Sequence, residues 1–188
     1  LLGDTFLLTK PDFTPIKTHP DRSLDPAKDQ IYFLHKEMAQ SQVRLEFSSG
    51  LLDESLTPSV QLFNEYFGGG MAGLVFQELR EARALAYSAW ARFFTPARPN
   101  EENILVGSIG CQADKTMDAV QAFVKLLKEM PVNENRWESA HTSILSSYRT
   151  NPIASRSMPA YFYNVHSLGL EMDPRENRFA ALSKAKIS

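Results

Sequence analysis

The fold is decided by the stretch Gly68-Gly69-Gly70-Met71-Ala72-Gly73-Leu74-Val75-Phe76-Gln77-Glu78-Leu79-Arg80. The glycines can end one helix and allow a tight reversal into the next. The apolar residues that follow are spaced three, four and seven apart, which predicts a helix over residues 71–83. A strand over 87–94 comes directly after it. The sequence therefore predicts that two hydrogen-bond donors, Arg80 on the helix and Tyr87 at the start of the strand, meet at one edge of a sheet.

The segments around this stretch predict a sheet flanked by helices. Strands are expected at 30–35 and 42–47 from their β-branched and aromatic content, with alternation along 42–47. Two more are expected at 87–94 and 103–112, as a hairpin joined by a proline-bearing loop. Further helices are expected to begin at the caps Thr57, Asp114 and Asn133, and a less regular one to cover 153–168. Because strands and helices come in groups, we predict an α+β fold with an antiparallel sheet and helices packed on one face.

The domain organisation is simple. Residues 1–28 carry scattered prolines and are expected to be a linker or N-terminal arm, whereas 29–188 are long enough for one domain with its own core. The first residue is Leu1, so we read the chain as a piece of a longer protein. Its compartment stays open, with bacterial cytoplasm and periplasm both compatible.

Composition excludes several classes of function. The net charge of -2 gives no basic field for nucleic acid, and no basic, aromatic-studded strand face is evident. No apolar run is long enough to span a bilayer. The single cysteine, Cys111, cannot form an internal disulfide and is expected to be a buried, inert thiol on a strand.

Three segments carry a family resemblance, namely 41–47, 62–70 and 169–174 together with the Leu79-Arg80 and Leu85-Ala86-Tyr87 pattern. In these the chain resembles the C-terminal, non-metal domain of the insulinase and pitrilysin peptidases, which include the mitochondrial processing peptidase and its bacterial relatives. The resemblance implies the processing-peptidase fold. It also implies that Arg80 and Tyr87 bind an extended peptide substrate held at a zinc ion on another domain.

The family's zinc motif, His-x-x-Glu-His, is absent from this chain. The histidines are His19, His35, His141 and His166, and none has a second histidine at ligand spacing. We therefore predict no metal ligand and no catalytic residue here, and no peptide hydrolysis by the isolated domain. Zinc is expected on a partner domain or chain, in cis or in trans.

Other interpretations of these residues stay open. Arg80 could be an ordinary charged helix residue, which is how Arg83 is read, and Tyr87 an ordinary half-buried strand residue. The aromatic residues of 137–163 are assigned to packing. In the peptide-binding interpretation, pairing of the extended peptide with an edge strand would add to the binding by Arg80 and Tyr87. The alternative function is a non-catalytic scaffold subunit of the same fold.

Overall fold

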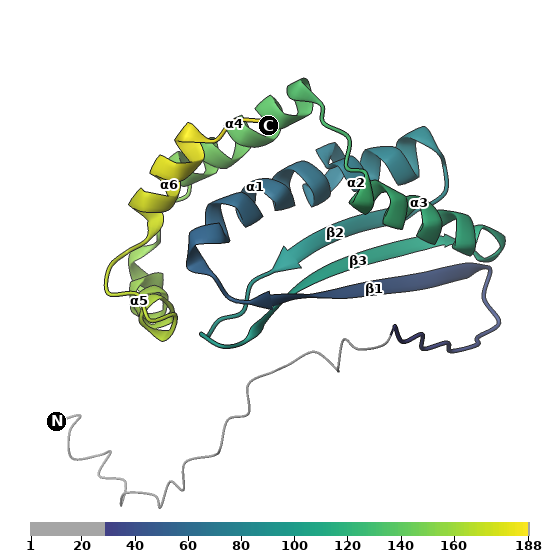
Figure 1. The fold of residues 1–188 in the computed structure, drawn as a ribbon, viewed down its shortest axis with the longest axis horizontal. Helices are drawn as coiled ribbons and strands as arrows, with labels where there is room; N and C mark the ends of the chain where they lie inside the picture. Colours follow the sequence, from purple (N-terminus) through teal and green to yellow (C-terminus); the bar gives the residue numbers. More distant parts are fainter. Residues whose placement is uncertain (1–28, 188) are drawn as a thin grey trace, which may run out of the picture.

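The computed structural model describes residues 29–187 and contains a three-stranded antiparallel sheet in the order β1-β3-β2. The strands are β1 (Gln40–Leu51), β2 (Ser88–Phe94) and β3 (Glu102–Gln112). Figure 1 shows helices along one side of this sheet. The predicted α+β class and antiparallel sheet are confirmed. The predicted arm over residues 1–28 lies outside the described residues.

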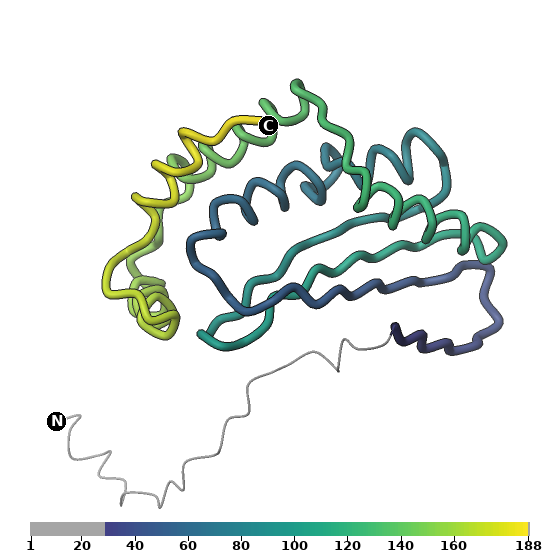
Figure 2. The backbone as a smooth tube through the Cα atoms, in the orientation of Figure 1, coloured from purple at the N-terminus to yellow at the C-terminus, as the bar shows by residue number. Residues whose placement is uncertain are grey.

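The helices are α1 (Thr57–Gly68), α2 (Leu74–Phe76), α3 (Thr116–Lys128), α4 (Glu134–Thr150), α5 (Met158–Ser167) and α6 (Arg175–Lys184). A π-helical turn, Gln77–Ala82, continues α2. Figure 2 shows α4 and α6 running together on the side of α1 remote from the sheet. They are joined there by His141, whose Nε2 lies 2.7 Å from the Leu182 carbonyl oxygen.

The core lies between the sheet and the helices. Phe67 of α1 and Phe123 of α3 are fully buried and meet edge to face, with their ring centroids 6.2 Å apart. A Cβ on Gly107 of β3 would lie 2.3 Å from the Phe123 ring, so this strand position must be glycine for α3 to pack so closely. Cys111 is 0% exposed on β3, which confirms the predicted buried thiol.

Several predicted elements need correction. Residues 30–35 form no strand, because no neighbouring strand pairs with them. The helix expected over 71–83 is broken at Gly73, whose extended backbone (φ -62, ψ 149) lets α2 begin only at Leu74. The helix predicted over 153–168 is shorter, because α5 starts only at Met158.

Of the three predicted helix caps, only Asn133 is confirmed. Asn133 caps α4, since its side chain accepts a hydrogen bond from the Arg136 amide. Thr57 is instead the first residue of α1, and Asp114 lies in a 3₁₀ turn ahead of α3. No helix among residues 29–187 is long and apolar enough to cross a membrane.

Candidate functional site

Arg80 and Tyr87 each lie next to an end of one tight turn, which is closed by hydrogen bonds to the Leu79 carbonyl. The Leu79 carbonyl accepts hydrogen bonds from the amides of Leu85 at 2.9 Å and Ala86 at 3.3 Å. Ala84, with φ 48, supplies the left-handed residue that this reversal needs. Because Arg80 follows Leu79 and Tyr87 follows Ala86, the two predicted site residues are each one position from the same hydrogen-bonded pair.

The Arg80 side chain is held loosely and remains accessible. It belongs to the π-helical turn, a wide helix geometry that is common at functional sites. Its Cζ lies 4.8 Å from the centroid of the Phe76 ring, and its Nε lies 3.6 Å from Glu81 Oε1. The side chain is 47% exposed, so most of its donors can still reach a ligand.

Tyr87 is anchored through its backbone and is free at its ring. Its amide donates to the Gly110 carbonyl at 2.7 Å, which fixes the residue against β3 just before β2 begins. The residue is 52% exposed. Within residues 29–187 no hydrogen bond engages its hydroxyl or joins it to Arg80. The structure thus presents two accessible donors from neighbouring points of the backbone, and neither is locked in the core.

The glycine turn before Arg80 is held by one local and one long-range side-chain hydrogen bond. Gln77 Nε2 donates to the Met71 carbonyl at 2.6 Å, and Arg136 Nη1 donates to the Ala72 carbonyl at 2.7 Å. Sequence reasoning missed Arg136, because it lies 64 residues from its partner and no local pattern connects the two. Arg136 therefore positions the turn from which the Arg80 segment starts.

The edge of β2 next to this site is covered by α1. The Asn64 side chain donates to the Phe93 carbonyl at 2.9 Å and accepts from the Phe93 amide at 2.7 Å, so it imitates a neighbouring strand. Farther along, a Cβ on Gly68 would lie 1.8 Å from the Ala91 carbonyl oxygen. A peptide cannot add to β2 beside these covered groups, which rules out at this edge the strand pairing considered from the sequence.

Arg83 differs from Arg80 in its partner but not in its accessibility. Its side chain is 49% exposed, and its Nε lies 3.9 Å from Glu78 Oε2. That is the geometry of a solvated surface ion pair, in agreement with the prediction. Arg83 is therefore a natural reference for the effect of removing one exposed arginine from the same turn of chain.

Residues 29–187 do not offer a site for a zinc ion. In the described part of the chain, no group of three or more histidine, cysteine, aspartate or glutamate side chains could hold a metal. His141 stacks on Trp137, with ring centroids 4.6 Å apart, in a packing role. His35 and Glu37 lie on an exposed segment outside any strand.

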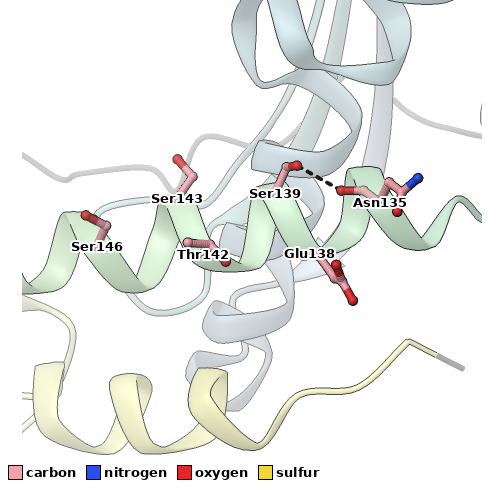
Figure 3. A pocket seen from close by; sticks show the side chains of 6 residues that line it. All are labelled: Asn135, Glu138, Ser139, Thr142, Ser143 and Ser146. Carbon is pink, nitrogen blue, oxygen red and sulfur yellow. Dashed lines mark hydrogen bonds between the residues drawn. The ribbon is translucent and has the colours of Figure 1, made fainter.

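Two other polar surfaces are structural. Figure 3 shows a shallow depression along α4 whose lining side chains all come from that helix, and Ser139 there donates to the backbone carbonyl of Asn135 at 2.8 Å. Near α6, the guanidinium of Arg175 holds the pKa of Asp173 well below its usual range. Burial, reinforced by the hydrogen bond to Asp173, raises the pKa of Tyr161 to about 12. These groups satisfy one another and offer no free ligand.

The aromatic residues fall into two groups. Tyr148 donates a hydrogen bond to Gln61, and Trp137 packs against the core, as predicted. Phe162 and Tyr163 are 51% and 72% exposed, so their assignment to packing is wrong.

The open face of the sheet also departs from the prediction. Trp90 and Phe94 lie on it at 40% and 43% exposure, with the Arg92 guanidinium over the Phe94 ring. This face therefore carries aromatic residues beside arginines, although no basic, aromatic-studded strand face was expected from the sequence. Glu46 shares this face and forms an ion pair with Arg44, so the face is not uniformly basic.

Comparison with known proteins agrees with the fold. Residues 6–143 match the family described as the peptidase M16 inactive domain. The peptidase M16 inactive domain from Pseudomonas fluorescens has a TM-score of 0.67 at 15% identity, over 80% of this chain and 36% of that one. A protease from Helicobacter pylori has a TM-score of 0.66 at 13% identity, over 81% and 37%. An inactive peptidase domain from Bordetella parapertussis has a TM-score of 0.61 at 12% identity, over 82% and 84%.

This chain spans little more than a third of the length of the Pseudomonas and Helicobacter chains. No match was found among curated proteins. At these identities the structural likeness concerns the fold alone, whereas the family match covers most of the sequence. The chain therefore belongs to the peptidase M16 inactive domain family.

Proposed function

We propose that this domain binds an extended peptide for a zinc centre carried by another domain or chain, with Arg80 and Tyr87 as the donors that hold a peptide carbonyl. The observation that carries the proposal is the tight turn closed by the Leu79 carbonyl. Its carbonyl binds the amides of Leu85 and Ala86, and so brings the starting points of two accessible donors together.

The chemistry of the two groups suits this role. A guanidinium and a phenol both donate hydrogen bonds, and a carbonyl oxygen gains negative charge when its carbon is attacked. Donors that are already in place stabilise that charge without reorganising. In this proposal another domain or chain supplies the metal and the group that activates water, and residues 29–187 contribute no metal cluster.

The test uses the complex of this domain with its zinc-bearing partner and compares two arginines whose exposure in the isolated domain is nearly equal. Arg80→Ala removes a proposed donor, and Arg83→Ala removes a solvated charge from the same segment. Loss of one such donor costs about 3 kcal/mol, so kcat should fall by about 100-fold in the Arg80 variant. The Arg83 variant should stay within about twofold of the parent, since exposed ion pairs contribute little.

A second comparison isolates the phenol. Tyr87→Phe keeps the ring and removes only the hydroxyl, and Tyr163→Phe makes the same change at another exposed tyrosine. We expect Tyr87→Phe to lower kcat and Tyr163→Phe to leave kcat unchanged. Equal rates for the Arg80 and Arg83 variants, with Tyr87→Phe unchanged, would refute the proposal and favour the scaffold function.

A further inference from the structure

The outer edge of β1 has no partner strand among residues 29–187. The Ala39 carbonyl accepts a hydrogen bond from the Ala113 amide, and in the register Ser41 lies opposite Cys111 and Val43 opposite Ile109. Hydrogen bonding alternates along an antiparallel pair. From Gln40 to Ser48, the even-numbered residues of β1 therefore point their backbone amides and carbonyls away from β3. Those of Gln40, Gln42 and Arg44 form an open row.

An apolar segment of the same chain lies just upstream. Ile31, Tyr32, Phe33 and Leu34 are 93%, 80%, 84% and 90% exposed. Consecutive aromatic and β-branched residues favour a strand, and left uncovered they favour aggregation. Figure 2 shows the chain reversing direction between this segment and β1.

We propose that Gln30–His35 closes onto the free edge of β1 as a fourth, antiparallel strand of the sheet. The connection is Lys36–Ala39, a four-residue loop of ordinary hairpin length. With this loop His35 pairs with Gln40, so Phe33 pairs with Gln42 and Ile31 with Arg44. Each of these three pairs falls on a β1 residue whose backbone groups point away from β3.

The same register suits the side chains. Tyr32 comes opposite Val43 and Leu34 opposite Ser41, on the face that packs against the helices. Val43 and Leu45 are only partly buried at this edge, although they belong to the core. Tyr32 would cover Val43, so closure buries apolar surface on both partners. A shift by one residue would send Tyr32 and Leu34 to the solvent face.

Amide hydrogen exchange of the 188-residue chain, followed residue by residue by NMR, tests the pairing. The amides of Ile31, Phe33 and His35 should exchange at least about tenfold more slowly than those of Tyr32 and Leu34, because only the first set faces β1. Uniformly fast exchange overturns the proposal. Uniformly slowed exchange overturns it too, since that indicates collapse without strand pairing.

A cysteine pair fixes the register. Directly opposite residues in an antiparallel sheet lie within disulfide range, so Tyr32→Cys with Val43→Cys should form an intramolecular disulfide under mild oxidation. The matched control is Phe33→Cys with Val43→Cys, whose side chains fall on opposite faces and should stay reduced. Cys111 is fully buried and does not compete.

Size-exclusion chromatography of the oxidised variant shows whether the segment that pairs with β1 comes from the same chain or from a second copy. A monomeric disulfide supports closure onto the chain's own edge, whereas a disulfide-linked dimer shows that the segment pairs with a second copy and overturns the proposal. Equal oxidation of the two cysteine pairs also overturns it. None of these outcomes depends on Arg80 or Tyr87, so a failure here is separate from a failure of the proposed peptide binding.

Discussion

Gly68→Ala should destabilise the domain strongly, because α1 contacts the backbone of β2 at this residue. The added Cβ would lie 1.8 Å from the Ala91 carbonyl oxygen and 2.9 Å from the Ala91 carbonyl carbon. Cβ contacts in proteins essentially never fall below 3.0 Å, so the two atoms must separate by about 1.2 Å. Neither is the end of a flexible side chain, so the helix itself has to move.

The cost follows from what that movement disturbs. Phe67, the residue before Gly68, is 0% exposed and packs against Phe63 and Phe123. Moving α1 away from β2 would loosen these contacts. Overpacking typically costs 1–3 kcal/mol, and with no side chain able to yield we expect about 3 kcal/mol. In a domain of this size that lowers Tm by about 6–12 °C.

The assay is urea unfolding followed by the fluorescence of Trp90 and Trp137, with Gly50→Ala as the matched control. Gly50 has φ +58 and nothing within 4 Å of a built Cβ, so alanine there meets only backbone strain of about 1 kcal/mol. We expect the Gly68 variant to lose about three times as much free energy of unfolding. If it loses no more than the Gly50 variant, the reasoning about close approach is wrong.

Two further predictions concern other parts of the fold. Asn64→Ala removes both hydrogen bonds to Phe93, so it should lower the free energy of unfolding by about 2 kcal/mol and speed exchange of the Phe93 amide; unchanged protection there would contradict the edge-covering role. Tyr161 should ionise near pH 12 in a spectrophotometric titration, and at lower pH in Asp173→Asn. Because the folded-state pKa of Asp173 is depressed, its contribution to stability is present above about pH 4 and lost on acidification. The stability difference between parent and Asp173→Asn should therefore shrink from pH 7 to pH 3, and a constant difference would contradict the ion pair's role.

Much of the fold follows from local pattern. The strands predicted over 87–94 and 103–112 agree with β2 and β3 to within one residue. Burial alternates along β2, whereas the central strand β3 is buried over most of its length. The helix start at Asn133 follows from one side chain and the amide three residues later. Such features depend on neighbours in the sequence, so they can be predicted without coordinates.

The features that shape the site depend on distant neighbours. Asn64 covers an edge 29 residues away, and Arg136 holds a turn 64 residues away. The π-helical turn under Arg80 likewise has no sequence signature, since its apolar spacing fits an α-helix as well. Arg80 and Tyr87 were selected by family resemblance. The structure adds that both side chains are accessible and that the turn closed by the Leu79 carbonyl lies between them. Their role in peptide binding stays a prediction.

The two edges of the sheet bear on how this domain can hold a peptide. An exposed strand edge invites indiscriminate pairing, and proteins usually cover or close it. Here α1 covers β2 through Asn64 and Gly68, and the proposed closure of Gln30–His35 would occupy β1. A sheet closed in this way cannot take up a peptide by strand addition. Recognition would then depend on side-chain donors beside the sheet, which is the position that Arg80 and Tyr87 occupy.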